Sequence, residues 1–446
     1  MKNLDELMEN VTVLGAAGKM GSGIALLLAQ EMAKLKIKNP DKSYHLYIVD
    51  VSEQALDGLL GYLRAQATKA AEKGCVMLRE LYKDRKDLVE NFDIINQFTI
   101  DTMKVLRPST VLESSKKSNM VFEAILEDED AKINILKQMN SICSPETYYL
   151  TNTSSIPIHF LDEKAGLDGR IIGYHFYNPP AVQKLAELIS AQSTKKELVE
   201  LSYELAKRLR KKIVPSNDIA GFIGNGHFMR DILHAIDETN NLSDTFSLVE
   251  AIYAMNKISQ DYLVRPMGIF QLMDYVGVDV CQLIMKVMTK HIEGVSLENS
   301  LINRLREKGV NGGQYPDGRQ KDGFLKYEKN RPSGVYDIEN EKYIMFDPEG
   351  WTKKVDSKLG PLPENWAPWR KLLRDPKRDE KLKSFFDNLK KMDTLGASLA
   401  KNYFHRSKEI GENLVKDGVA QSEEDVNTVM KSGFFHLYGP INDYIS

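Results

Sequence analysis

The chain has 446 residues, of which 42% are hydrophobic, and this is enough for two or three domains with separate cores. The formal net charge is -3, and acidic and basic residues are well mixed along the sequence. The whole chain therefore offers no electrostatic case for binding nucleic acid or an anionic membrane. No apolar run reaches the ~20 residues that a membrane-spanning helix requires.

The chain carries three cysteines, Cys75, Cys143 and Cys281, which are far apart and odd in number. There is no CxxC pair, and no histidine stands at metal-ligand spacing with another histidine, cysteine or carboxylate cluster. We therefore expect neither a disulfide framework nor a metal site. The N-terminus, Met1 to Gly18, has acidic residues where a signal peptide has basic ones. These features predict a cytoplasmic protein.

Two short apolar runs, 11–14 and 45–49, predict β-strands, and the alanine- and leucine-rich segment 24–36 between them predicts a helix. This order of strand, helix and strand is how a parallel α/β sheet begins. The same patterns continue downstream, with helices predicted at 52–73 and 128–139 and strands at 119–125 and 148–150. We expect residues 1–215 to form one doubly wound α/β domain of the Rossmann type.

Strand signals become rare after Ile219, and helical periodicity takes their place. Helices are predicted at 221–239, 247–257, 267–275 and 280–291. We therefore expect an all-α domain at 216–337. The segment 338–379 has prolines, tryptophans and dense charge with little periodicity, which predicts an irregular linker. Helical patterning then runs through 380–446.

A weak internal repeat relates the two helical segments. Residues 249–255 are followed by 265–270, and residues 424–430 are followed, in a similar order and at similar spacing, by 438–441. This similarity predicts that 380–446 is a second, shorter copy of the helical domain. The alternative is that two unrelated helices share a chance similarity.

The first predicted strand runs into a glycine-rich turn at 15–23 with the spacing GxxGxxG. Glycine lets the backbone turn sharply and approach a diphosphate closely, while the following helix presents its N-terminal amides to the anion. The candidate cofactor contacts of this turn are Gly15, Gly18, Lys19, Met20 and Gly21. The alternative is an ordinary turn between a strand and a helix.

Asp50 ends the second predicted strand, where an acidic side chain can accept both ribose hydroxyls of an adenosine. A carboxylate at this position also repels the 2′-phosphate of NADP. The next residues, Val51 and Ser52, are not arginines. The pattern therefore favours NAD as the cofactor, and the alternative is a solvated aspartate at a strand end.

Three further segments, 121–128, 151–157 and 172–188, follow in a characteristic order. With their VFEAIL, NTSS, HFYNP and KLAE sequences they resemble the 3-hydroxyacyl-CoA dehydrogenase family, whose members carry similar VEAI, NTSS, HFxNP and KLxE blocks. The resemblance continues through 221–225, 267–275 and 321–327 and so covers about the first three quarters of the chain. The C-terminal part is similar to a second copy of the family's helical domain, which some longer members have.

The residues fit the chemistry that this resemblance implies. Oxidation of a secondary alcohol needs a base for the hydroxyl proton, and histidine is the natural base near neutral pH. His175 lies in the apolar run 171–176, which predicts a strand, and Glu187 follows twelve residues later. A hairpin-like reversal at the intervening prolines would place both side chains on one face, where the carboxylate stabilises the imidazolium. The alternative is a buried histidine that only satisfies a backbone carbonyl.

The resemblance implies roles for five more residues. Ser154 and Asn225 would hydrogen-bond the substrate, and Glu127, Lys132 and Asn152 would lie near the cofactor and the acyl-CoA entrance. Three alternatives stay open: a helix-capping serine, a helix-surface amide, and a surface ion pair between the glutamate and the lysine.

Two departures from the family pattern flank Asn225. Ala220 stands where the family usually has proline, and Gly226 stands where it usually has arginine. They put the role of Asn225 in question, together with the chain-length preference for the acyl group.

By resemblance, the chain is an NAD-dependent oxidoreductase that interconverts (S)-3-hydroxyacyl-CoA and 3-oxoacyl-CoA, for example as a 3-hydroxybutyryl-CoA dehydrogenase, in fatty-acid β-oxidation or a related acyl-CoA pathway. The start at the dinucleotide fold favours a separate dehydrogenase that works alongside an enoyl-CoA hydratase or a thiolase. Single-unit members pair through the helical domain, so a duplicated unit favours a monomer over a homodimer. The alternatives are another β-hydroxyacid dehydrogenase, a non-catalytic NAD-binding member, and a C-terminal module that docks a β-oxidation complex.

Overall fold

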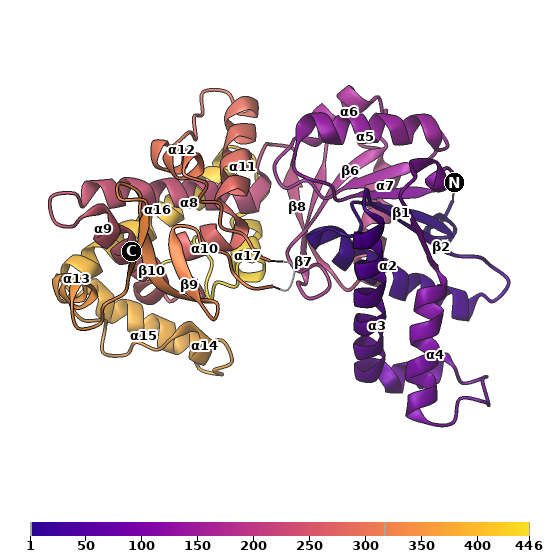
Figure 1. Cartoon of the computed structure of the whole chain (residues 1–446), viewed down its shortest axis with the longest axis horizontal. Helices are drawn as coiled ribbons and strands as arrows, with labels where there is room; N and C mark the ends of the chain where they lie inside the picture. The colour runs from indigo at the N-terminus through magenta and orange to yellow at the C-terminus, as the bar shows by residue number, and fades with distance from the viewer. Residues whose placement is uncertain (1, 316–317, 446) are drawn as a thin grey trace. The chain divides into compact units, whose positions relative to one another are not determined.

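The structure is a computed structural model that describes residues 2–315 and 318–445. The chain divides into two compact units, Met1–Asp218 and Ile219–Ser446 (Figure 1). The first unit holds the β-sheet expected for the N-terminal domain, and the second contains the helices predicted after Ile219.

The first unit is built on one eight-stranded sheet with the order β3-β2-β1-β4-β5-β6-β7-β8. The strands are β1 (Asn10–Leu14), β2 (His45–Val49), β3 (Leu106–Ser109), β4 (Met120–Glu123), β5 (Tyr148–Thr151), β6 (Ile171–Phe176), β7 (Leu185–Ser190) and β8 (Lys212–Asn217). The first six strands are parallel, β7 runs antiparallel to β6, and β8 is parallel to β7. Because the strand order reverses beside β1, the sheet has the switch point at which doubly wound folds bind ligands. The predicted Rossmann-type fold is confirmed.

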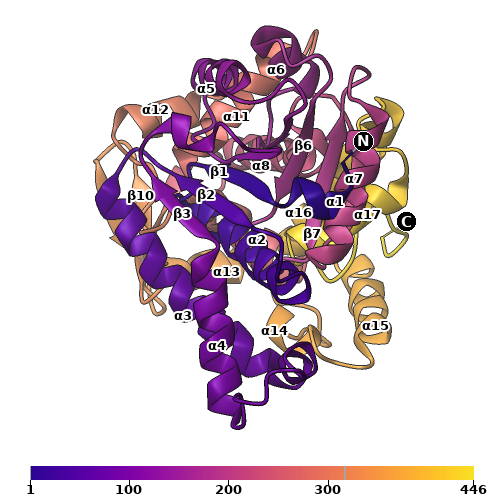
Figure 2. The ribbon, with the colours of Figure 1, turned by 90° about the vertical axis from the view of Figure 1, so that its right-hand side faces the viewer.

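Helices cover both faces of this sheet. They are α1 (Leu4–Leu7), α2 (Lys19–Lys38), α3 (Glu53–Leu81), α4 (Asn91–Lys104), α5 (Glu129–Ile142), α6 (Ile158–Ala165) and α7 (Lys196–Arg208). The long helices α3 and α4 pack along each other (Figures 1 and 2). The predicted helix at 24–36 begins earlier than expected, at Lys19, because Gly21 and Gly23 lie inside α2. Their low intrinsic helix propensity conceals the true start of the helix.

The alternation of side chains along β6 decides which residues face the site. Ile172, Tyr174 and Phe176 are buried in the core that this sheet shares with α2 and α7. Gly173 points to the opposite face, where a Cβ atom would lie 2.9 Å from a side-chain carbon of Ile158 on α6. Since successive side chains of a strand alternate between faces, His175 lies on the α6 side of the sheet.

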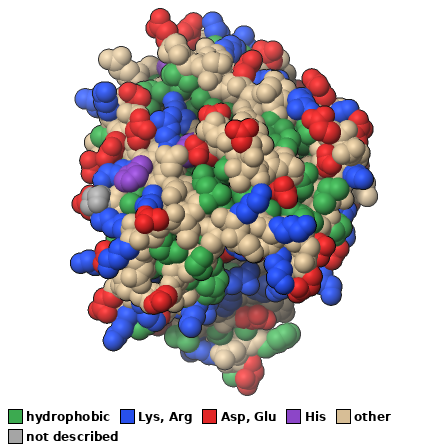
Figure 3. Space-filling view, turned by 90° about the vertical axis from the view of Figure 1, so that its left-hand side faces the viewer, with side chains coloured by type: hydrophobic (Ala, Val, Ile, Leu, Met, Phe, Trp, Pro, Cys, Tyr) green, Lys and Arg blue, Asp and Glu red, His purple; other side chains and the backbone are tan. Residues whose placement is uncertain are grey.

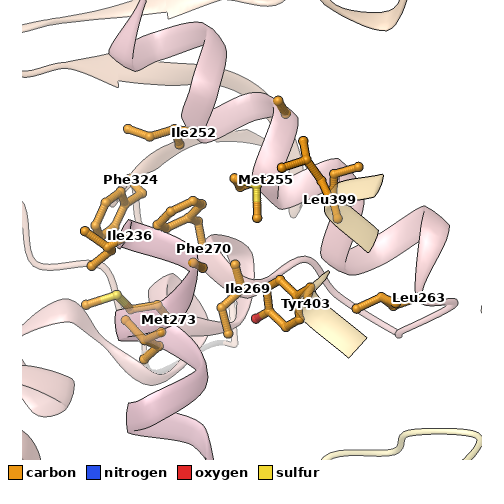
Figure 4. Close-up of a cluster of buried hydrophobic side chains, with 14 of the residues drawn as sticks. Ile236, Ile252, Met255, Leu263, Ile269, Phe270, Met273, Phe324, Leu399 and Tyr403 are labelled. Carbon is orange, nitrogen blue, oxygen red and sulfur yellow. The ribbon is translucent and has the colours of Figure 1, made fainter. Parts of the chain in front are cut away.

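The second unit is largely helical. Its helices are α8 (Phe222–Asn241), α9 (Leu248–Lys257), the π-helical turn η2 (Ile258–Tyr262), α10 (Ile269–Val276), α11 (Val278–His291), α12 (Ser300–Glu307), α13 (Trp351–Leu359), α14 (Trp369–Leu372), α15 (Arg378–Lys390), α16 (Leu395–Lys416) and α17 (Glu423–Gly433). Side chains from α8, α9, α10 and α16 converge in one core (Figure 4). Both predicted helical segments therefore contribute to the same hydrophobic cluster.

Two features of this unit depart from the sequence prediction. A three-stranded antiparallel sheet, formed by β9 (Leu325–Glu328), β10 (Arg331–Asp337) and β11 (Lys342–Met345), interrupts the region expected to be purely helical. The prediction of an irregular segment at 338–379 is wrong, because β11, α13 and α14 lie within it. In α13 only three residues are buried. The spacing of its apolar residues therefore gives too weak a signal to predict a helix among so many charged residues.

The three tryptophans of this segment tie it to the rest of the second unit. The indole N–H groups of Trp351, Trp366 and Trp369 donate hydrogen bonds of 2.8–2.9 Å to backbone carbonyl oxygens. Two of these acceptors, Asp261 and Phe435, lie far away in the sequence. The segment is therefore a packed part of the unit and not a free connection.

The surface carries charges of both signs. Figure 3 shows lysine and arginine side chains interspersed with aspartate and glutamate over one face of the protein. Within residues 2–315 and 318–445, no helix is both long enough and apolar enough to cross a membrane.

Replacement of Phe270 in the core of the second unit tests this packing. Phe270 is fully buried, and its ring centroid lies 4.8 Å from that of Phe324 (Figure 4). We expect Phe270→Ala to lower the free energy of unfolding by about 3–5 kcal/mol, because it leaves a cavity. Urea denaturation followed by circular dichroism measures this change. The control is Phe92→Ala, whose side chain is 74% exposed, and an equal effect of both substitutions would contradict the packing described.

Candidate active site

The glycine-rich turn between β1 and α2 has room for glycine alone at two positions. Gly15 has a φ of +68°, and a Cβ atom there would lie 2.6 Å from the carbonyl oxygen of Ala124. A Cβ atom at Gly21 would lie 2.1 Å from the carbonyl oxygen of Gly15. Gly18 is the N-cap residue of α2, so the turn leads directly to the free amides of that helix. The backbone thus forms a close-fitting cradle of the kind that holds a diphosphate.

Asp50 lies beside this turn, as predicted from its place at the end of β2. Its Oδ2 atom accepts a hydrogen bond of 2.9 Å from the amide of Ala17, and its Oδ1 atom accepts one of 2.8 Å from the amide of Val51. Lys19 and Met20 occupy the first turn of α2, where burial lowers the pKa of the Lys19 ammonium. The glycine-rich turn, the N-terminus of α2 and the Asp50 carboxylate together fit a dinucleotide whose adenosine ribose carries no 2′-phosphate.

His175 and Glu187 lie opposite each other in the antiparallel pair β6–β7. The Nδ1 atom of His175 is 3.2 Å from the Oε1 atom of Glu187. The glutamate side chain is fully buried, and the histidine side chain keeps 11% of its surface exposed. The reversal at the prolines therefore brings the two side chains onto one face, as predicted. A carboxylate on Nδ1 leaves Nε2 as the ring nitrogen that can exchange a proton with a substrate.

The loop after β5 carries Asn152 and Ser154 and is held by hydrogen bonds from two directions. The Oδ1 atom of Asn152 accepts a hydrogen bond of 2.9 Å from the amide of Phe176, which ties the loop to the end of β6. The Oε1 atom of Glu127 accepts hydrogen bonds from the amides of Ser154 and Ser155 at 2.8 and 3.0 Å. The Ser154 loop is therefore fixed beside the strand that carries His175.

Glu127 and Lys132 belong to a buried ion network. The Nζ atom of Lys132 lies 2.7 Å from Glu123 and 3.4 Å from Glu127, and its side chain is only 1% exposed. The alternative of a surface ion pair is therefore wrong. Burial alone would raise the pKa of Glu127, but Lys132 and the hydrogen bonds from 153–155 outweigh burial and lower it. The carboxylate thus stays ionised and keeps its hold on the Ser154 loop.

Glu123 was not among the residues selected from the sequence. It ends the buried strand β4, and its side chain also accepts a hydrogen bond from the hydroxyl of Thr151 on β5. The available signal was an acidic residue at the end of an apolar strand, with a lysine nine residues later. Such a pair is favoured inside a protein only when each charge finds its partner.

Asn225 lies in the first turn of α8, in the second unit. Packing within that unit explains why a glycine, Gly226, follows it. A Cβ atom at Gly226 would lie 3.0 Å from a methyl carbon of Leu414 on α16, so a larger residue would require that side chain to shift. The neighbouring His227 is fully buried, and its Nε2 atom lies 3.0 Å from the carbonyl oxygen of Ser407 on α16. The departure from the family pattern thus accommodates α16.

Comparison with known proteins assigns the family. Residues 10–219 match the NAD-binding domain of 3-hydroxyacyl-CoA dehydrogenases, and residues 248–327 match the C-terminal domain of the same family. A probable 3-hydroxybutyryl-CoA dehydrogenase of Bacillus subtilis is 31% identical over 276 residues, which are 62% of this chain and 84% of that protein. The chain belongs to the 3-hydroxyacyl-CoA dehydrogenase family. Its first unit is accordingly an NAD-binding domain.

A second relative supports this assignment, and a solved structure shows the same fold. The human mitochondrial hydroxyacyl-coenzyme A dehydrogenase is 30% identical over 281 residues, which are 62% of this chain and 79% of the human protein. The crystal structure of 3-hydroxybutyryl-CoA dehydrogenase from Escherichia coli superposes with a TM-score of 0.63 at 21% identity. That match covers 97% of this chain and 90% of the bacterial one, so the two share a fold along almost their whole length.

Substitution of Gly15 tests the cofactor cradle. We expect Gly15→Ala to weaken NADH binding at least about tenfold, or ~1.4 kcal/mol, because the methyl group meets backbone atoms and the left-handed φ becomes strained. Fluorescence titration with NADH measures the dissociation constant. The matched control is Gly58→Ala on α3, where a Cβ atom meets nothing within 4 Å. Equal affinities for the two variants would contradict a binding role of the turn.

Proposed function

We propose that the protein interconverts (S)-3-hydroxyacyl-CoA and 3-oxoacyl-CoA with NAD, in fatty-acid β-oxidation or a related acyl-CoA pathway. The observation that carries this proposal is the contact of 3.2 Å between His175 Nδ1 and Glu187 Oε1, on strands that face the Ser154 loop. A paired imidazole at the carboxyl end of a parallel strand, in an NAD-binding domain, is suited to take a proton from a secondary alcohol.

In the oxidative direction, His175 accepts the proton of the 3-hydroxyl group at Nε2. Glu187 stabilises the imidazolium that forms and fixes the tautomer of the neutral ring. Ser154 and Asn225 orient the substrate by hydrogen bonds to the reacting oxygen and the thioester carbonyl. When bound, NAD supplies the hydride acceptor. In the reductive direction, the same imidazolium returns the proton to the oxygen.

The turn residues and Asp50 would hold the cofactor. The amides of Gly18, Lys19, Met20 and Gly21 would receive the diphosphate, and Asp50 would accept hydrogen bonds from the adenosine ribose. The same carboxylate would repel a 2′-phosphate, so we propose NAD specificity over NADP. Glu127, Lys132 and Asn152 would act indirectly, by holding the loop that carries Ser154.

The reduction of acetoacetyl-CoA by NADH tests this function, with NADH absorbance as the readout. We expect His175→Ala to lower kcat by about 10²- to 10⁴-fold, since it removes the base, while NADH binding persists. The control is His405→Ala, on the exposed side of α16, which should leave turnover unchanged. A native chain that binds NADH yet turns over neither acetoacetyl-CoA nor longer 3-oxoacyl-CoAs would overturn the assignment in favour of a non-catalytic NAD-binding protein.

We also propose that 380–446 is a second, shorter copy of the helical domain. Supporting this, the Oδ1 atoms of Asn256 and Asn427 accept hydrogen bonds, both of 3.0 Å, from the amides of Gln271 and Ile441. In each case a glycine stands twelve residues after the asparagine, at 268 and 439, and a Cβ atom on it would collide with that asparagine side chain. The asparagine and the glycine thus have the same spacing in both segments, and the donor amide follows the asparagine by 15 residues in the first and by 14 in the second.

The backbone between each asparagine and its glycine supports the same correspondence. Val264 and Phe435, each eight residues after the asparagine, have left-handed φ values of 50° and 58°. This conformation is uncommon for residues other than glycine, so its recurrence at one position of two segments favours a common origin over chance. The helices before these turns also begin alike, with Ser247 and Ser422 capping α9 and α17.

The duplication predicts a monomer in solution. α16, which belongs to the proposed second copy, packs along α8 within one chain, and we propose that it covers the surface through which single-copy members pair. We therefore expect light scattering to give a molar mass near 50.6 kDa at all concentrations measured. A mass twice as large would show that the second copy does not replace a partner subunit.

A further inference from the structure

Tyr177 directly follows β6 and occupies the variable position of the HFxNP block. Its hydroxyl donates a hydrogen bond of 2.7 Å to the Oε1 atom of Glu187. The ring also contacts His175, with 4.9 Å between the two ring centroids. Tyr177 therefore lies against both members of the proposed catalytic pair.

The phenol and the imidazole share one carboxylate oxygen. The Oε1 atom of Glu187 that accepts the hydrogen bond from Tyr177 at 2.7 Å is also the atom 3.2 Å from His175 Nδ1. Of the two donors, the phenol makes the shorter contact. A hydrogen bond to a carboxylate oxygen stabilises part of its negative charge. The carboxylate then stabilises a neighbouring imidazolium less strongly.

The phenol is a permanent donor in this arrangement. Burial and the neighbouring Glu187 carboxylate raise the pKa of Tyr177 well above its usual value. The hydroxyl therefore keeps its proton at every pH at which the enzyme would work, and it donates its hydrogen bond to Glu187 throughout this range.

We infer that Tyr177 is a positioning residue that shares Glu187 with His175 and thereby makes the histidine a weaker base. This inference rests on the proposed function, in which His175 must be unprotonated to accept the proton of the 3-hydroxyl group. By weakening the hold of Glu187 on the imidazolium, Tyr177 keeps the histidine unprotonated to lower pH. Oxidation of hydroxyacyl-CoA thus extends toward neutral and slightly acidic conditions.

Other charged and titratable groups lie on the elements around the pair. On β8 the residue opposite Glu187 is the apolar Val214, and Lys212 lies on the same sheet face at the exposed start of that strand. The Ser154 loop is held by Glu127 and its partner Lys132, and on the α6 side of the sheet the Nδ1 atom of His159 lies 2.7 Å from the Oδ2 atom of Asp218. A Tyr177→Phe substitution keeps the ring and removes the hydroxyl that shares Glu187 with His175.

The test compares Tyr177→Phe with the native chain and with Tyr174→Phe. Tyr174 is a matched control on the same strand, because it is fully buried on the opposite face and its hydroxyl has no hydrogen-bond partner among the described residues. For the oxidation of 3-hydroxybutyryl-CoA, we expect Tyr177→Phe to move the acid limb of the kcat/KM profile up by about 0.5–1 pH unit. The plateau kcat should change by less than about twofold, and the control profile should match the native one.

A second measurement does not depend on turnover. The imidazole nitrogens of His175, assigned by their loss in His175→Gln, are titrated by NMR in the protein without cofactor. We expect the titration midpoint to move up in Tyr177→Phe and to stay in place in Tyr174→Phe.

The outcomes separate the two proposals. An active native chain with unchanged profile and midpoint in Tyr177→Phe would overturn the role of Tyr177. A fall in kcat at every pH without a shift would also overturn it, since the phenol would then only hold Glu187 in place. An inactive native chain would overturn the proposed function, and the NMR midpoint alone would then decide whether Tyr177 weakens the base.

Discussion

One backbone register, in which His175 of β6 pairs with Glu187 of β7, brings an imidazole and a carboxylate within 3.2 Å. A slip of one residue would turn one of the two side chains to the opposite face, where Ile172, Tyr174 and Phe176 form the core. Burial of these large side chains therefore also determines where the catalytic pair points. Packing on one face of β6 and chemistry on the other are consequences of the same alternation.

The remaining polar groups of the site lie at the carboxyl ends of the parallel strands, because these ends meet at the same edge of the sheet. β1 leads into Gly15, β2 leads into Asp50, and β5 leads into the Ser154 loop. The loop would be free to move without a fixed anchor, and the buried charges of Glu127 and Lys132 provide it. An ion pair of this kind adds little net stability, but it holds one geometry, because the loss of either partner leaves the other charge unpaired.

Prediction from the sequence was accurate where the chemical pattern is local and failed where it depends on distant contacts. β2 and β6 were predicted with their observed bounds, because each is a short apolar run with clear ends. α2 was predicted to start late, since its glycines are required by contacts with Gly15 and Pro180 that no propensity encodes. The role of Tyr177 was missed for a similar reason, as its partner is known only once β6 and β7 pair.

The two helical segments of the proposed duplication differ in the length of the helix before the turn. From the capping serine to the turn-closing asparagine there are nine residues in the first segment, Ser247 to Asn256, and five in the second, Ser422 to Asn427. The difference of four residues is about one helical turn, which keeps the asparagine on the same helix face. A difference of two residues would instead rotate that side chain by about 200°, away from its turn. The proposed duplication is therefore compatible with the different spacing in the two segments.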